Sequence, residues 1–160
     1  MDGADSMTDR PEDLLQSGPM HWFSEWPIGS VPTSGAIVYT IWNRAYDFIY
    51  VGMSGRTQAA EAARVSGPYG RLNLHASGRR SGDQFCIYVS DRFVLPRLQN
   101  RIAEIADGTL SLDAETRAYI RENLGFRWVT ATSGKDALKL EREIQAGSLC
   151  VGKPALNPSR

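Results

Sequence analysis

The sequence predicts an α+β fold in which a small central antiparallel β-sheet is flanked by helices. The chain has 160 residues, of which 42% are hydrophobic, and this suits a single packed domain. Residues 36–52 contain two runs of β-branched and aromatic side chains around a short polar turn, a pattern typical of a β-hairpin. Further along, apolar residues recur at three- and four-residue spacing, which is typical of amphipathic helices. We therefore expect about three strands, with one further strand candidate.

The hairpin has the strongest local signal. Its first strand is expected from Ala36 to Asn43 and its return strand from Phe48 to Gly52, with residues 43–47 as the turn. The first strand is dominated by residues that favour extended backbone: Ile37, Val38, Tyr39, Thr40, Ile41 and Trp42.

Helices and strand candidates alternate after the hairpin. Alanines at residues 57–65 predict a helix that ends at the Ser-Gly-Pro break of residues 66–68, and a second helix follows from Tyr69 to Ala76. The later candidates are a strand over Gln84 to Ser90, helices over Pro96 to Ala106 and Asp113 to Leu124 (the latter closed by Gly125), and a strand over Phe126 to Ala131.

The last helix is expected from Ser133 to Ala146. It opens with a capping-box pattern, because Asp136 follows Ser133 by three residues. The tail from residue 147 to residue 160 is expected to be irregular.

Two parts of unequal size organise the chain. Residues 1–35 are expected to be an N-terminal arm whose first 20 residues are polar and mobile. Its segment around Trp22, Phe23 and Trp26 is expected to dock onto the domain, the alternative being that it stacks on bases or on a partner. Residues 36–160 are expected to form the main domain, with an insertion around residues 84–124.

The composition also limits the compartment. No apolar run approaches the length of a membrane span, and the acidic N-terminus lacks the apolar stretch of a signal peptide. Cys86 and Cys150 make neither a disulfide framework nor a metal cluster, so we expect two buried thiols. These observations predict a cytoplasmic protein without a membrane partner.

Charge is unevenly distributed along a chain whose net charge is zero. Residues 1–36 carry six acidic side chains and one arginine, a net of −5, whereas residues 56–101 carry eight arginines and three acidic side chains, a net of +5. Arginine grips phosphate with a planar fork, so the second segment is a candidate nucleic-acid surface, although an ordinary solvated surface remains the alternative. The arginines proposed to contact DNA are Arg56, Arg64, Arg79 and Arg80.

Six polar residues are candidates for chemistry. Glu141 lies on or beside the apolar stripe of the last helix, where a carboxylate needs a partner, either a divalent metal ion or a buried cation. Arg71 and His75 are four residues apart and share a helix face. Tyr39 and Tyr50 lie on adjacent strands and can meet on one face if the register suits. Asn157 lies in a proline-containing turn.

With these residues in their order along the chain, residues 36–157 resemble the GIY-YIG nuclease superfamily. The two strand motifs stand here as Ile37-Val38-Tyr39 and Tyr50-Val51-Gly52. Arg71 and His75 match the arginine and histidine of the family. Glu141 matches its helical glutamate, and Asn157 matches its late asparagine. The first motif has Ile37 where the family has glycine, and the gap to Arg71 is long, so that Arg56 or Arg64 stays an alternative for the functional arginine.

The resemblance implies hydrolysis of DNA phosphodiesters beside one Mg²⁺ or Mn²⁺ ion held by Glu141. Tyr39 is then the expected base, provided that the site favours its anion, and Arg71 the expected partner for phosphate charge. Tyr50, His75 and Asn157 are expected to orient the water, the phosphate or the metal site. The family does not say whether the chain forms a dimer that cuts both strands.

Two other functions remain open. The first is a non-catalytic nucleic-acid-binding module on the same scaffold. The second is an interaction protein that uses Trp22, Phe23 and Trp26 as its contact. Metal-dependent DNA cleavage, and DNA binding that weakens with salt, separate the three hypotheses.

Overall fold

The computed structural model describes residues 10–55 and 67–157, and it confirms an α+β fold built on an antiparallel sheet. The sheet has four strands in the order β1-β4-β2-β3. Their bounds are β1 His21–Trp22, β2 Ala36–Asn43, β3 Phe48–Ser54 and β4 Leu124–Ala131. β2 therefore lies between β4 and β3, and β3 is an edge strand.

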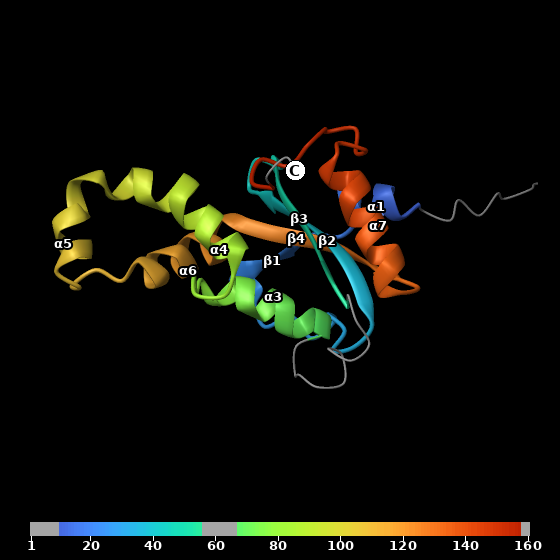
Figure 1. Ribbon diagram of the computed structural model, residues 1–160, viewed down its shortest axis with the longest axis horizontal. Coiled ribbons are helices and arrows are strands. Elements are labelled where there is room, and N and C mark those ends of the chain that lie inside the picture. The colour runs from blue at the N-terminus through green and yellow to red at the C-terminus, as the bar shows by residue number, and fades with distance from the viewer. Residues whose placement is uncertain (1–9, 56–66, 158–160) are drawn as a thin grey trace, which may run out of the picture.

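Both faces of the sheet are covered, which is why the central strand β2 is apolar at nearly every position. On one face, Val38, Trp42 and Val51 pack against α1 (Pro11–Ser17) and α7 (Gly134–Gln145). Figure 1 shows these two helices together on one side of the sheet. The hydrophobic stripe of α7 supplies Ala137 and Ile144 to this layer.

The other face carries the larger core. There Tyr39, Ile41 and Tyr50 pack with residues of α3 (Gly67–Ser77), α4 (Gln84–Val89) and α6 (Leu112–Asn123). Between α4 and α6 the chain continues as a π-helical turn over Ser90–Val94, a 3-10 helix over Leu95–Arg101, and α5 (Ile102–Ala106). This helical arm extends away from the sheet, with α5 at its far end (Figure 1).

Several local predictions are confirmed. β2 has the bounds expected of the first hairpin strand, and α6 matches the predicted helix to within one residue at each end. The Ser133 hydroxyl accepts a hydrogen bond from the Asp136 amide, so the capping pattern begins α7 as expected. Gly125 does not end α6, however. It is the second residue of β4, where a Cβ would collide with the Trp22 ring.

The strand expected over Gln84 to Ser90 is wrong, because this segment forms α4. Asp83 caps the helix by accepting a hydrogen bond from the Phe85 amide. The buried residues Phe85, Cys86 and Val89 follow helical spacing, so the apolar run that suggested a strand is one face of a helix. The fourth strand of the sheet is instead β1, from the N-terminal segment.

The N-terminal segment is folded from residue 11 onward, so the expectation of a mobile arm is wrong for this stretch. Leu15 of α1 is fully buried, and its carbonyl accepts a hydrogen bond from the Thr40 hydroxyl. Docking of the aromatic segment is confirmed, since Phe23 and Trp26 are buried. The Trp26 indole also donates to Asn73 of α3 at 2.9 Å.

Three further expectations differ from the structure or lie outside it. The helix expected over residues 57–65 falls outside the described residues. The helix expected from Pro96 to Ala106 is a 3-10 helix followed by α5, with a kink at Leu98. Cys86 is buried as expected, whereas Cys150 is exposed. In the described ranges, no helix is both long and apolar enough to cross a membrane.

Candidate active site

The two motif tyrosines lie on the same face of the sheet. In the β2–β3 pairing, Tyr39 is opposite Gly52 and Ile41 is opposite Tyr50, so the four positions share one side of the ladder. Both tyrosine rings belong to the larger core, and Tyr39 is fully buried. The register therefore places two phenols as neighbours, as the prediction required.

Gly52 provides the space into which the Tyr39 ring extends. A Cβ at residue 52 would lie 2.9 Å from Cε2 of Tyr39 and closer still to Cζ and Oη. No side chain beyond hydrogen fits there without displacing the ring. The glycine of the second motif is thus a steric requirement for the position of Tyr39.

Helix α3 brings Arg71 and His75 to the same place from one helix face. His75 is fully buried, and its Nε2 lies 2.7 Å from the Tyr39 hydroxyl. The Arg71 guanidinium also hydrogen-bonds the Tyr39 oxygen. Arg71 is thus the arginine that the described part of the chain places beside the tyrosines, whereas Arg56 and Arg64 lie outside the described residues. The Tyr39 hydroxyl has contacts to a cation on one side and to an imidazole on the other.

One residue of this cluster was missed by the sequence analysis. Asp83 is 1% exposed, and its Oδ2 lies 2.7 Å from Nδ1 of His75. The same oxygen accepts from the Cys86 thiol at 3.2 Å. The available signal was a Gly-Asp pair before an apolar run, which is an N-cap pattern once that run is taken as a helix.

Burial governs the protonation of the buried groups. It raises the pKa of Tyr39 well above 10.0, with Tyr50 adding to the rise and Arg71 opposing it. Burial therefore keeps Tyr39 protonated in the absence of a metal ion, and a site that favours its anion when Mg²⁺ or Mn²⁺ is bound stays a prediction. Burial also lowers the pKa of His75 below 6.5, and Asp83 only partly opposes this. His75 is accordingly neutral and able to accept a proton at Nε2.

Glu141, the candidate metal ligand, lies on a helix that covers the other face of the sheet. Glu141 lies on α7, which packs against β3, and its side chain is half-buried. Its charge helps to raise the pKa of Tyr50, which burial brings to about 12. Glu143, two residues on, is exposed, as expected. The structure thus couples Glu141 electrostatically to one of the two tyrosines.

Asn157 lies at the edge of the sheet, where its side chain hydrogen-bonds the backbone of β3. Its Oδ1 accepts from the Val51 amide at 2.8 Å, and its Nδ2 donates to the Val51 carbonyl at 2.9 Å. The Leu156 amide donates to the Ile49 carbonyl in the same way. The tail therefore covers the free edge of β3 and fixes the backbone between Tyr50 and Gly52.

The donor set fits a largely hydrated hard cation. Mg²⁺ and Mn²⁺ accept carboxylate oxygen and keep several waters, so Glu141 is a chemically sufficient protein ligand. Within the described residues there is no group of three or more histidine, cysteine, aspartate or glutamate side chains that could hold a metal ion. His75 is not free to bind one, because both its ring nitrogens have hydrogen-bond partners.

The arginines proposed to contact DNA have mixed surroundings. Arg79 is exposed, whereas Arg80 pairs with Asp113 at 2.8 Å. Arg56 and Arg64 lie outside the described residues. One arginine of the positive segment is therefore paired with an acidic residue of α6.

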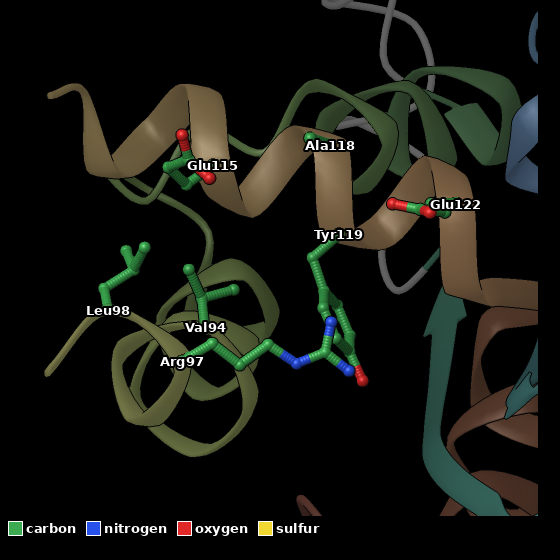
Figure 2. Close-up of a pocket in the computed structure, with 7 residues that line it drawn as sticks. All are labelled: Val94, Arg97, Leu98, Glu115, Ala118, Tyr119 and Glu122. Atoms are coloured by element: carbon green, nitrogen blue, oxygen red, sulfur yellow. The ribbon is translucent and has the colours of Figure 1, made fainter. Parts of the chain in front are cut away.

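A pocket on the helical arm contains none of the predicted site residues (Figure 2). It lies between the turns around Val94 and the helix α6, and Figure 2 shows Arg97 extended across the Tyr119 ring. The guanidinium carbon is 4.8 Å from the ring centroid, which is within the range of a cation–π interaction.

Comparison of the chain with protein-family models, with curated proteins and with solved structures gave no match. Membership of the GIY-YIG superfamily therefore remains a prediction that rests on the residues and on their geometry.

Proposed function

We propose that the chain is a divalent-metal-dependent DNA endonuclease that hydrolyses phosphodiester bonds by in-line attack of water. The observation that supports this most directly is the convergence of Tyr39, Arg71 and His75 in one hydrogen-bonded group. The charge of Glu141 adds to the effect of burial in raising the pKa of Tyr50. Buried polar groups cost stability unless they are hydrogen-bonded, and an arginine beside a tyrosine and a histidine supplies the cation and the proton acceptors that phosphoryl transfer can use.

Each residue has a role that follows from its chemistry. Arg71 has a guanidinium Nε that is buried and without a hydrogen-bond partner among the described residues, so the cation retains capacity for an anionic ligand. It is suited to stabilising the charge that develops on the phosphate. The Tyr39 oxygen is the acceptor for the proton of the attacking water, and Tyr50 lines the same face.

A divalent metal ion would add to the positive charge that Arg71 supplies to the phosphate. When bound to Glu141, Mg²⁺ or Mn²⁺ would polarise a phosphate oxygen and stabilise the leaving 3′ oxygen. Glu141 would hold the ion from a helix that is anchored to the sheet by Ala137 and Ile144.

The test is cleavage of supercoiled plasmid and of long duplex DNA of mixed sequence in the presence of Mg²⁺ or Mn²⁺. Glu141→Gln should reduce cleavage by more than about 100-fold, because the neutral amide binds the cation poorly. The matched control is Glu143→Gln, a change of the same kind on an exposed side chain of the same helix, and it should cleave like the wild type. Full activity of Glu141→Gln would remove the proposed metal role.

The base is tested separately by Tyr39→Phe, which keeps the ring and removes the hydroxyl. We expect a loss of about 100-fold or more in the cleavage rate, the range typical of a general base. Wild-type protein that binds DNA in a salt-dependent way but never cleaves it would instead indicate a non-catalytic binding module. A protein that neither binds nor cleaves DNA would contradict both hypotheses.

A further inference from the structure

The carboxylate of Asp83 has two different tasks on its two oxygens. Oδ1 accepts a hydrogen bond from the Phe85 amide at 3.1 Å, which caps the first turn of α4. Oδ2 faces His75 Nδ1 at 2.7 Å and the Cys86 thiol at 3.2 Å. Helix capping needs only the first oxygen, so capping alone does not explain why a fully buried imidazole is placed against the second.

The contacts of Asp83 determine which His75 nitrogen carries the hydrogen. Burial alone would raise the pKa of Asp83, but the hydrogen bonds from His75 and Cys86 outweigh it, so the pKa is lowered and the side chain is an anion. An ionised carboxylate only accepts hydrogen bonds, so His75 Nδ1 must be the donor. In a neutral ring Nε2 is then bare, and it accepts the hydrogen of the Tyr39 hydroxyl at 2.7 Å.

We propose that Asp83 is a positioning residue of this site: it holds His75 in the tautomer whose Nε2 accepts the proton of Tyr39. This inference rests on the proposed hydrolase function and adds a residue to it. Asp83, His75 and Tyr39 form a buried line from carboxylate to imidazole to phenol, contributed by the α4 N-terminus, α3 and β2.

A buried tyrosine is a poor base because its anion is unfavourable, and the hydrogen-bonded series from Asp83 through His75 to Tyr39 removes this difficulty. As water attacks phosphorus, one water proton passes to the Tyr39 oxygen while the original hydroxyl proton passes to His75 Nε2, so that Tyr39 stays neutral. A new P–O bond forms, and the bond to the 3′ oxygen breaks with its electron pair; this oxygen takes a proton from solvent. The imidazolium is stabilised by Asp83 and returns its proton through Tyr39 to solvent after the product leaves.

Asp83→Asn separates capping from positioning. The amide oxygen can still accept from the Phe85 amide, but the amide nitrogen then faces His75 Nδ1 and favours the ring with hydrogen on Nε2. That hydrogen would point at the Tyr39 oxygen, and Nε2 could no longer accept. The matched control is Cys86→Ala, which removes the other partner of Oδ2 and leaves the His75 contact in place.

The first measurement is the tautomer itself, read from the ¹⁵N chemical shifts of labelled histidine. The chain has two histidines, so His21→Gln assigns the signals. We expect hydrogen on Nδ1 of His75 in the wild type and in Cys86→Ala, and on Nε2 in Asp83→Asn. Hydrogen on Nε2 in the wild type would overturn the inference whether or not the protein cleaves DNA.

The second measurement is plasmid cleavage with Mg²⁺ as a function of pH. Asp83→Asn should lower kcat by about 100-fold or more with KM nearly unchanged, as for other carboxylates that orient a histidine. Besides Asp83, the titratable or charged groups around His75 are Tyr39, Tyr50, Arg71 and Cys86. Among these, the Asp83 anion favours protonated His75, so its removal should move the acid limb of kcat to lower pH.

The two proposals fail in distinguishable ways. If the wild type has the expected tautomer and never cleaves DNA, the proposed function fails and the placement of His75 by Asp83 stands. If the wild type cleaves and Asp83→Asn keeps both its kcat and its acid limb, the positioning role is overturned while the hydrolase function stands. If Asp83→Asn does not fold, the wild-type tautomer still decides, because it is measured without the variant.

Discussion

The steric dependence of Tyr39 on Gly52 makes a quantitative prediction for Gly52→Ala. The added Cβ would lie 2.9 Å from one ring carbon of Tyr39 and closer to two further atoms, including the hydroxyl oxygen. Tyr39 is fully buried between β4 and α3, so the ring has no empty space to enter. We therefore expect the ring to be displaced and its hydrogen bond to His75 to break.

The cost has two parts. Overpacking of a filled core typically costs about 1–3 kcal/mol. Breaking the Tyr39–His75 bond leaves a buried donor and a buried acceptor unpaired, which adds about 1–3 kcal/mol. The free energy of unfolding should fall by about 2–6 kcal/mol in total, and a domain with a typical stability of about 5–15 kcal/mol can remain folded after all but the largest of these losses.

Urea unfolding followed by tryptophan fluorescence measures this directly. A double-mutant cycle with Tyr39→Leu identifies the cause, because leucine lacks the two ring carbons and the hydroxyl oxygen that lie nearest residue 52. In that background Gly52→Ala should be neutral, or stabilising by about 0.5–1 kcal/mol, since glycine inside a strand is unfavourable.

Gly29→Ala is the matched control. Nothing lies within 4 Å of a Cβ at residue 29, so the change should stay within about 0.5 kcal/mol of the wild type. An equal cost of Gly52→Ala in both Tyr39 backgrounds would refute the steric argument, and so would a cost below about 0.5 kcal/mol in the wild type.

Two further predictions follow from the edge strand and from the buried histidine. Asn157→Ala removes both side-chain hydrogen bonds to Val51, so it should lower the free energy of unfolding by about 1–3 kcal/mol and speed hydrogen exchange of the Val51 amide; unchanged exchange would contradict the anchoring role. The free energy of unfolding should also fall as pH drops below about 6.5, because the pKa of His75 is lowered in the folded chain and the unfolded chain binds the proton first. Between about pH 7 and pH 5, the free energy of unfolding measured in urea should fall less in His75→Gln than in the wild type. Burial also lowers the pKa of His21, so His21→Gln measures the part of the fall that comes from that residue.

Elements with a strong local pattern were predictable from the sequence. The first hairpin strand has the expected bounds because its β-branched and aromatic residues suit a pleated strand that is packed on both faces. The start of α7 was predictable because a capping box satisfies amides within one turn of the chain. The shared face of Tyr39 and Tyr50 follows from the same hairpin, once its register is known.

The errors share a cause in tertiary packing. A short apolar run such as Gln84 to Ser90 fits a buried strand or one face of a helix, and periodicity alone does not separate them. The misassigned strand also hid Asp83, whose role as an N-cap is visible only if a helix follows. Leu15 was missed in a similar way, since a single leucine in a polar segment is buried only when the sheet lies beneath it.

The sequence by itself determined which chemical groups are present and in what order the local elements bring them. The tertiary structure decided their protonation and their partners. The pKa of Tyr39 depends on exclusion of water, and the His75 tautomer depends on a carboxylate eight residues further along the chain. Both properties depend on a buried site that several packed elements form together, so no single segment of the sequence determines them.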